Sequence, residues 1–300
     1  MRPFATMTFV AGTLVAAAGM VGSPAPVQAH RATDPFASLP STLQLTAVIR
    51  DFKGRDQTGG HQDFERQPTA GFGVYACMLA DELDAEGKPV FRGTGNKVNA
   101  YWRDGAGRNR IDPRSYIAAQ AGDVNGSMQS TAGGALNSKG QFDQWYRDIP
   151  GVNMSKTIPL TLTRIANTNT YSYNNNNFFP VNNDLLGNSG GSTPNTNFHF
   201  TTEIDTEFMF ERNKGQVFTF TGDDDVWVFI DGKLVVDIGG VHSAVSQAIE
   251  LDRLTWLTDG DTYRLKVFHA ERHRTQSNFR IDTNLRLKTV ELPPVSGTFD

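Results

Sequence analysis

The chain has 300 residues, enough for one large β domain or two smaller ones. Its 28 Lys and Arg against 32 Asp and Glu give a net charge of −4, which disfavours nucleic acid and anionic membranes as partners. The 29 glycines, with many Asn and Thr residues, favour a loop-rich β protein over a helical one. Cys77 is the only cysteine, so no internal disulfide can form. Because it lies in an apolar run, we interpret Cys77 as a buried small residue rather than a nucleophile.

The first 29 residues have the three parts of a secretory signal peptide. Arg2 supplies the positive charge, residues 9–21 form the apolar core, and Val27-Gln28-Ala29 fits the cleavage rule. The apolar run is too short and too rich in Ala and Gly for a membrane anchor, and no other stretch predicts a membrane span. We therefore expect cleavage after Ala29 and a secreted, periplasmic or cell-surface protein, with residues 30–41 as a linker.

The first half of the mature chain predicts few regular elements. Alternating apolar residues indicate a strand over residues 42–50 with one buried face. Residues 72–79 and 157–165 are typical of two further strands. Apolar residues at i, i+3, i+4 and i+7 predict a short amphipathic helix over residues 142–149, stopped by Pro150-Gly151. Residues 99–135 show no sustained period and give no assignment.

Residues 167–197 are rich in Asn, Gly, Ser and Thr and predict one long surface loop. A loop of this length is usually either functional or disordered, and disorder is the simpler expectation. The alternative is that the loop lines a ligand groove, because its aromatic residues are interleaved with amides: Tyr171, Tyr173, Phe178 and Phe179.

The second half of the chain predicts closely spaced strands and almost no helix. Such a pattern favours an all-β fold, an antiparallel β-sandwich or barrel with long loop insertions and one short helix. No repeat or long linker divides it, so we expect one domain over residues 42–288 and a loose tail over residues 289–300. A strand and turn are expected over residues 249–258, and the other strands are expected at residues 204–211, 216–221, 226–230, 233–238, 263–268 and 279–287.

The stretch from Thr221 to Asp237 is the most informative in the chain. Residues 226–230 are apolar on both faces, which indicates a strand covered on both sides. Asp231-Gly232 then predicts a type I′ hairpin turn. Three carboxylates precede the strand and repel one another beside an apolar core, so they need strong donors or a cation such as calcium. A solvated acidic turn is the alternative for this cluster, which consists of Asp223, Asp224 and Asp225.

Further candidate ligand contacts flank this hairpin. If the strand from Tyr263 continues, it brings His269, Glu271 and His273 onto one face. That pattern allows a zinc site, although no HExxH motif is present, or structural ion pairing of Glu271 with neighbouring arginines. His242 follows the hairpin and either reaches the aspartates or caps a loop. The full candidate set is Trp227, His242, His269, Glu271 and His273.

Two long motifs resemble the bacterial fibro-slime domain. They are GDDDVWVFIDGKLVVDIGGVH and LTWLTDGDTYRLKVFHAERHRTQSNFRIDTNL. Upstream, VIRDFKGR, HQDFE and FDQWYRDIPGVN resemble the amino-terminal part of that family. The resemblance extends over about residues 43–288, whereas residues 90–135 match little of it.

The core DDDVWVFIDGKLVVD is also similar to protective-antigen-type β-barrel domains, which occur in bacterial toxins, glycosidases and yeast adhesins. In the calcium-dependent lectins of that group, two aspartates joined by a cis peptide hold the ion, which contacts sugar hydroxyls. The resemblance implies this role for Asp224 and Asp225, with Asp223 beside them and Asn278 as a candidate further ligand. Other domains of this type hold no metal.

The leading hypothesis is a secreted, non-catalytic, calcium-dependent carbohydrate-binding or adhesion module whose partner is a glycan or polysaccharide. The alternative is a structural cell-surface or extracellular-matrix protein whose partner is another protein. A glycoside hydrolase is a third possibility, since Asp223–Asp225 and Glu271 supply carboxylates that can flank a cleft. No Ser-His-Asp order, zinc motif or phosphate loop points to another enzyme class.

Overall fold

The computed structural model describes residues 34–289, so the expected signal peptide and residues 290–300 of the tail lie outside the described residues. The described part is built almost entirely of antiparallel strands, with one short helix, α1 (Lys139–Phe142), and one 3-10 turn, η1 (Leu251–Arg253). The strands are β1 (Thr42–Phe52), β2 (Tyr75–Ala76), β3 (Asn96–Ala100), β4 (Trp102–Arg103), β5 (Asn109–Arg110), β6 (Ser127–Ala132), β7 (Asn153–Arg164), β8 (Tyr171–Asn175), β9 (Phe200–Met209), β10 (Val217–Gly222), β11 (Asp225–Ile230), β12 (Lys233–Ile238), β13 (Val245–Glu250), β14 (Thr262–Glu271), β15 (Phe279–Thr283) and β16 (Lys288–Thr289).

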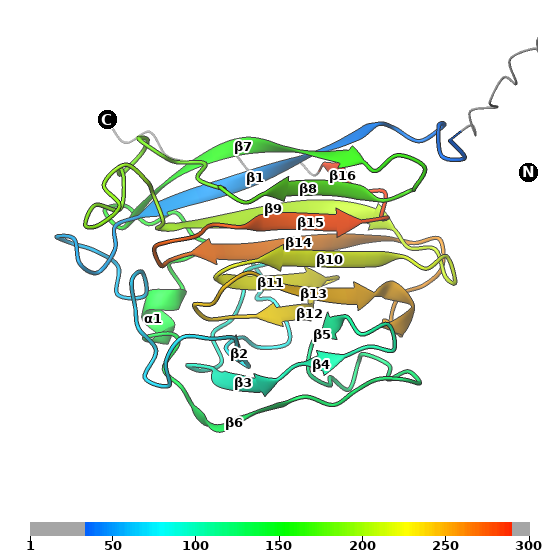
Figure 1. The fold of residues 1–300 in the computed structure, drawn as a ribbon, viewed down its shortest axis with the longest axis horizontal. Coiled ribbons are helices and arrows are strands. Elements are labelled where there is room, and N and C mark those ends of the chain that lie inside the picture. The colour runs from blue at the N-terminus through cyan, green and yellow to red at the C-terminus, as the bar shows by residue number, and fades with distance from the viewer. Residues whose placement is uncertain (1–33, 290–300) are drawn as a thin grey trace, which may run out of the picture. The chain divides into compact units, whose positions relative to one another are not determined.

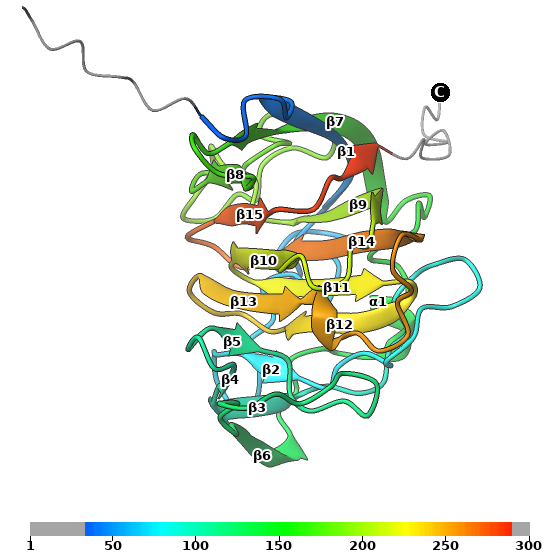
Figure 2. The ribbon, with the colours of Figure 1, turned by 90° about the vertical axis from the view of Figure 1, so that its right-hand side faces the viewer.

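The main sheet folds over on itself to make a two-layer sandwich. Its strand order is β12-β11-β14-β9-β1-β7-β8-β15-β10-β13, with β16 added beside β9. In the side view, β8, β15, β10 and β13 form one layer, and β7, β1, β9, β14, β11 and β12 form the other (Figures 1 and 2). At the open seam, Gln247 of β13 exchanges side-chain hydrogen bonds with the backbone of Asp237 in β12, at 2.8 and 3.4 Å. The expected antiparallel β-sandwich or barrel is therefore confirmed.

The strands β11 and β14 bury both of their faces. Between the layers, His269 lies among the rings of Phe200, Phe220 and Phe279. On the outer face of the same layer, Trp227 packs against Trp145 with ring centroids 6.2 Å apart. Because neighbouring residues on a strand point to opposite faces, two cores require an uninterrupted apolar run. Residues 226–230 are therefore all apolar because this strand packs against a core on each face.

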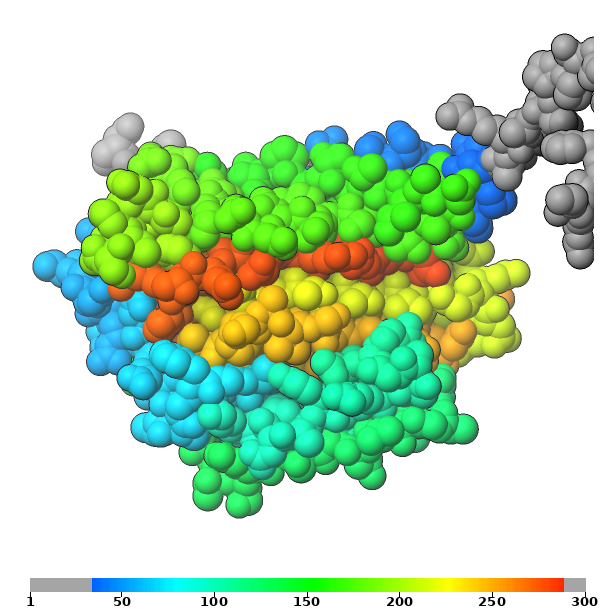
Figure 3. Space-filling view, in the orientation of Figure 1, coloured from blue at the N-terminus to red at the C-terminus, as the bar shows by residue number. Residues whose placement is uncertain are grey.

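Residues 75–132, which include most of the unassigned part of the sequence, form two small sheets beside the sandwich. They have the strand orders β2-β3-β6 and β4-β5. In the space-filling view, this cyan segment and the green segment around β7 and β8 border a band formed by β15, β10 and β13 (Figure 3). The strand expected over residues 72–79 is only Tyr75–Ala76, because Cys77 adopts a positive φ of 63°. The Cys77 thiol is free and only partly buried.

The helix expected over residues 142–149 is wrong in extent. Helix α1 ends at Phe142, and residues 143–147 form turns. Their carbonyl groups accept hydrogen bonds from other segments: Asn153 Nδ2 donates to Gln144 and Arg147, and the Thr201 hydroxyl donates to Trp145. Phe142, Trp145 and Tyr146 are buried as the pattern predicted.

The single long loop expected over residues 167–197 is also wrong. Residues 171–175 form strand β8, which pairs with β15 and β7. Tyr171 and Phe178 are buried in the core instead of lining an open groove. The remaining segment lies against the β14–β15 connection, where the Phe178 amide donates to the Ser277 carbonyl at 3.0 Å. The Asn-rich composition therefore concealed a strand.

Residues 34–41, the described part of the expected linker, pack onto the domain. Asp34 forms an ion pair with Arg164 at 2.7 Å, and the Tyr171 hydroxyl donates to the Pro40 carbonyl at 2.8 Å. Across residues 34–289, no helix has both the length and the apolar character required to cross a membrane.

Candidate functional site

A pocket of about 230 Å³ opens at the end of the sandwich where β11 begins and β12 and β14 end. The β12–β13 and β14–β15 connections meet there, at the left in Figure 1. Asp223 and Asp224 form one wall, and His273 and Arg274 form another. The pocket thus lies at the strand end that the sequence singled out. Its remaining lining residues are Phe72, Val241, His242, Ser243, Thr275 and Gln276.

The turn and the bend at the two ends of β11 set the directions of its flanking aspartates. Asp231 and Gly232 have φ of 50° and 77°, as the predicted type I′ turn requires. At the other end of β11, Asp223 and Asp224 lie in the bend between β10 and β11, and only Asp225 belongs to the strand. Because Asp223 and Asp224 are outside the strand, their side chains need not point to alternate faces of the sheet, so neighbouring carboxylates can contact different partners.

The Asp225 carboxylate does not line the pocket, because it forms a buried ion pair with Arg272. Both side chains are 0% exposed, and the guanidinium contacts both carboxylate oxygens through Nε and Nη2. Asp225 Oδ1 also accepts a hydrogen bond from the Gly240 amide at 2.6 Å. Burial opposes the charge on Arg272, but the Asp225 carboxylate outweighs it and raises the pKa of the guanidinium. This pair fixes the backbone behind the pocket.

Asp223 and Asp224 are held by uncharged donors. Asp223 accepts the Asn278 amide at 2.5 Å and the Asn278 side-chain Nδ2 at 2.7 Å. Asp224 accepts the backbone amides of Arg272 and His242 at 3.0 and 3.3 Å. Burial raises the pKa of Asp224 well above its usual range; Arg272 opposes this rise, and the Asp225 and Asp223 charges add to it.

Glu271 carries a buried carboxylate that makes no hydrogen bond of good geometry but lies close to the Ser277 side chain and the His273 backbone. Its side chain is 0% exposed and lies at the end of β14, directly behind the pocket wall. Burial, followed by the charges of Asp224 and Asp223, raises the pKa of Glu271 well above its usual range, and hydrogen bonds with the Ser277 side chain and the His273 backbone oppose the rise. Sequence reasoning named Glu271 as a candidate but did not reveal that it would be enclosed.

The other candidate residues divide between the pocket and the core behind it. His242 and His273 line the pocket. Trp227 is instead fully buried, with its Nε1 donating to Asp237 Oδ1 at 3.0 Å. His269 is also 0% exposed, and burial lowers its pKa to about 4, so it is neutral at pH 7. The structure therefore places Trp227 and His269 behind the candidate site, where they support it.

Glu65 and Phe72 contribute to the site but were missed in the sequence. Glu65 Oε1 contacts His199 Nε2 at 2.9 Å and accepts the Arg274 amide at 3.1 Å, which ties down the wall formed by residues 272–276. Phe72 is 44% exposed and meets His273 edge to face, with ring centroids 4.7 Å apart. No pattern of neighbouring residues in the sequence indicated a role for either one, because both reach the site from a distant loop.

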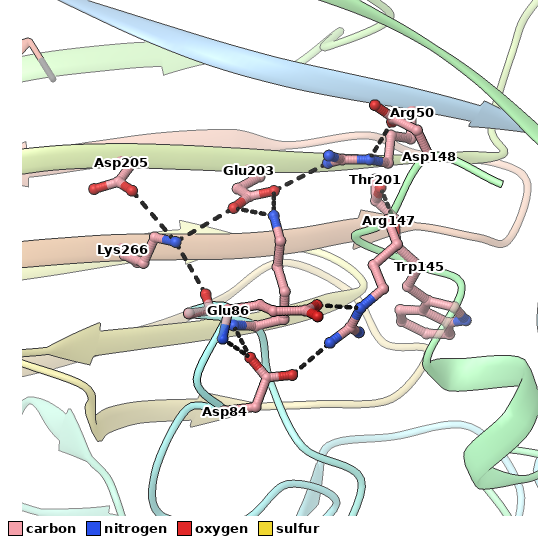
Figure 4. A network of polar contacts seen from close by, with 12 residues as sticks. Arg50, Asp84, Glu86, Trp145, Arg147, Asp148, Thr201, Glu203, Asp205 and Lys266 are labelled. Atoms are coloured by element: carbon pink, nitrogen blue, oxygen red, sulfur yellow. Dashed lines mark hydrogen bonds and ion pairs between the residues drawn. The ribbon is translucent and has the colours of Figure 1, made fainter. Parts of the chain in front are cut away.

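A second cavity, of about 640 Å³, lies on the outer face of β1, β9 and β14. A chain of alternating charges crosses its floor (Figure 4). Glu203, at its centre, contacts Arg50 at 3.0 Å, Lys88 at 2.6 Å and Lys266 at 3.5 Å. These cations outweigh burial and lower the pKa of Glu203. Because the acids on this floor already have counter-charges, the cavity lacks the uncompensated charge found at the strand end.

A cation at the strand end would need oxygen ligands beyond carboxylates. Within residues 34–289, no three His, Cys, Asp or Glu side chains are arranged to hold a metal ion. All described peptide bonds, including the one between Asp224 and Asp225, are trans rather than cis. Zinc ligation by His269, Glu271 and His273 gains no support, because His273 lies beyond the end of β14.

Comparisons with known proteins agree with the core of this fold. Residues 161–296 match the family model of the PA14 domain. The match includes the aspartates, Glu271 and every strand from β8 to β16. The chain therefore has the PA14-like β core that the hairpin motif predicted, while the likeness to fibro-slime domains stays a prediction.

Relatives from Dictyostelium discoideum extend the similarity upstream. The chain is 36% identical to protein psiR over 260 residues, which is 83% of this chain and 22% of psiR. It is 42% identical to protein psiD over 156 residues, which is 50% of this chain and 30% of psiD. The first relatives it matches are much longer proteins, of which it spans between 16% and 31%. Among solved structures, the PA14 domain of the antifreeze protein MpAFP aligns at 11% identity and a TM-score of 0.29, over 68% of this chain and 95% of that domain.

Proposed function

We propose that this protein is an exported, non-catalytic carbohydrate-binding module whose ligand is a glycan or polysaccharide. One observation carries the proposal: carboxylates and an exposed aromatic ring line the same open pocket. Asp223 and Asp224 line the pocket with only 2% and 3% of their surface exposed, as acceptors for sugar hydroxyls, and Phe72 offers an apolar face. Sugars combine polar rims with apolar faces, so a small site with both kinds of group suits them.

Calcium dependence is the finer part of this proposal. Asp225 is neutralised by Arg272, but Asp223, Asp224 and Glu271 have no cationic side chain within hydrogen-bond distance. Uncompensated buried carboxylates are costly unless they are protonated or paired with a cation. Calcium accepts carboxylate, amide, carbonyl and water oxygens, which fits a site with few carboxylates. A bound ion would neutralise this wall and offer open positions to vicinal hydroxyls.

A non-catalytic role is favoured because the carboxylates are poorly placed for hydrolysis. A glycosidase needs two carboxyl groups that reach opposite sides of the scissile bond. Glu271 has no exposed surface and Asp225 is bound to Arg272, so neither can reach a substrate. The alternative of a protein-binding matrix component remains an outcome of the test below.

The test is binding to immobilised neutral and acidic oligosaccharides, with calcium and with a chelator. We expect calcium-linked binding that Asp224→Asn and Phe72→Ala both abolish. Glu86→Gln is the matched control, because its carboxylate is 70% exposed and lies at the other cavity. If no glycan binds, or if Asp224→Asn binds unchanged, the proposed function is wrong. Capture of a protein partner without glycan dependence would then favour the matrix role.

A further inference from the structure

Strand β7 pairs along its whole length on one edge and almost not at all on the other. It pairs with β1 from Asn153 to Thr163, but with β8 only through Thr163 and Arg164. In Figure 1, β7 runs along the upper margin of the ribbon. Within residues 34–289, no strand pairs with the outer edge of residues 153–162. An unpaired edge of this kind is a template for an added strand.

The register shows which backbone groups of β7 point to the unpaired edge. The Arg164 amide donates to the Ser41 carbonyl at 2.8 Å, so the backbone groups of Arg164 face β1. Directions alternate along a strand, so even-numbered residues of β7 face β1 and odd-numbered residues face away from it. Pro159 is odd-numbered, which agrees with the confinement of proline to the unpaired side of an edge strand. Ser155 and Thr157 therefore present their N–H and C=O groups to the unpaired edge.

A pocket of about 550 Å³ lies beside this edge. Met154 and Ser155, which point to opposite faces of β7, both line it, and Met154 is 42% exposed. Because its walls come from both faces of the strand, the pocket lies where the next strand of the sheet would lie. Apolar side chains form much of its wall: Ile149, Pro150, Val152, Met154 and Leu186.

The uncompensated charge at this pocket is positive. Lys53 lines the pocket, is exposed and forms no ion pair with any residue of the described range 34–289. The acid of the pocket, Asp148, is already paired with Arg50 at 2.9 Å. A free lysine beside apolar walls fits an occupant that carries an acidic residue next to an apolar one, because opposite charges steer association and fix its register.

We propose that the unpaired edge of β7 docks an extended segment of a partner protein in which acidic and apolar residues alternate. The segment bonds through its backbone to Ser155 and Thr157, places an apolar side chain in the pocket and directs an acidic one to Lys53. In strand addition, main-chain bonds give affinity and pockets for alternate side chains give specificity. A second copy of this chain fits less well, because pairing β7 with itself through Ser155 and Thr157 sets Lys156 opposite Lys156.

This docking edge is separate from the proposed glycan site. None of the residues that line the pocket beside β7 lines the pocket at Asp223 and Asp224. Success or failure of one proposal therefore leaves the other unchanged.

The probe is a fluorescent synthetic octapeptide of alternating Glu and Val residues, and its binding to the full chain is followed by fluorescence anisotropy. Two further versions carry N-methyl groups on one or the other alternate set of amides. We expect the unmethylated peptide to bind, and only one of the two methylated versions to lose binding, because only one set of amides faces β7. A peptide with Lys in place of Glu should bind about fivefold more weakly.

Two variants of the protein test the edge and the charge. Thr157→Pro removes an outward N–H that the ladder with β1 does not use, so it should keep the fold and weaken peptide binding by about tenfold. Lys53→Glu should reverse the preference between the Glu and Lys peptides. Lys139→Glu is the matched control, because this side chain is 63% exposed on α1, and it should bind both peptides as the wild type does.

The proposal is overturned if no peptide binds, if both methylated versions bind as well as the parent, or if Thr157→Pro and Lys53→Glu leave binding unchanged. Sedimentation of the full chain examines the other occupants. A dimer that Thr157→Pro separates would make a second copy the occupant and overturn the partner protein. Peptide binding that appears only after removal of residues 290–300 would assign the edge to this chain's own segment, with the same consequence.

Discussion

Replacing Asp225 with Asn tests whether this aspartate is structural. The substitution removes the charge that neutralises Arg272, whose guanidinium is 0% exposed. Arg272 would retain a contact with the Asp63 carbonyl at 3.3 Å, the Trp145 ring at 5.6 Å and the more distant charges of Asp224 and Asp63, but no ion-pair partner in direct contact. Breaking a buried ion pair by removing one partner costs about 3–5 kcal/mol of unfolding free energy. For a domain of this size, that cost corresponds to a midpoint lower by roughly 6–20 °C.

The assay is thermal unfolding followed by circular dichroism in the presence of a chelator, so that no cation contributes. The control is Asp282→Asn, because the Arg280–Asp282 pair is 44% and 21% exposed and should contribute less than about 1 kcal/mol. The double variant Asp225→Asn/Arg272→Met should recover part of the loss, since it leaves no unpaired buried charge. The reasoning is refuted if Asp225→Asn costs no more than the control, or if the double variant is as unstable as the two single losses added together.

Three further predictions concern other parts of the chain. Burial lowers the pKa of His61 to about 4, so its contribution to stability is complete above the unfolded value of about 6.5 and is lost as the pH falls from there to about 4. His61 should account for about 3 kcal/mol of the stability lost between pH 7 and pH 4. Urea unfolding at the two pH values should therefore show a loss that is smaller by about this amount in His61→Gln than in the wild type, while the loss due to His269 remains in both. Glu203→Gln leaves three cations around an uncharged amide and should lower the free energy of unfolding by about 3 kcal/mol; a change below about 0.5 kcal/mol, as at an ordinary surface position, would contradict this view of the charge network. Mass spectrometry of the exported protein should show His30 at the amino terminus, and a form that still begins at Met1 in the exported fraction would disprove cleavage after Ala29.

Local patterns determined the central hairpin and the class of fold. Residues 226–230 had to be a doubly covered strand, because an apolar run of this length leaves no polar side for solvent. Asp231 and Gly232 adopt the positive φ values that their turn type demands. Such features depend on neighbours within a few residues, so sequence alone predicts them. The same is true of the strands β1, β7, β10 and β12, whose observed bounds lie close to those expected.

Long-range pairing decided what the sequence left open or assigned wrongly. Strand β8 consists of polar and aromatic residues, and pairing with β15 gives its backbone the hydrogen bonds that its composition did not signal. The helix over residues 142–149 is interrupted because Asn153 and Thr201 take carbonyls that a helix would have used. These partners lie several to more than fifty residues away in the chain, so no local window contains them.

The sequence located the carboxylates, but only the tertiary structure gave each one its role. The sequence does not distinguish Asp223, Asp224 and Asp225 by residue type, and the resemblance to protective-antigen-type domains implied metal binding for the last two. Folding assigns Asn278 to Asp223, backbone amides to Asp224 and Arg272 to Asp225. It also buries Glu271 near the Asp224 and Asp223 charges. The charge balance of a buried site depends on which groups meet there, because a carboxylate taken from water needs its compensation within a few ångströms. That distance is set by the packing of β10, β11 and β14, and local sequence does not encode it.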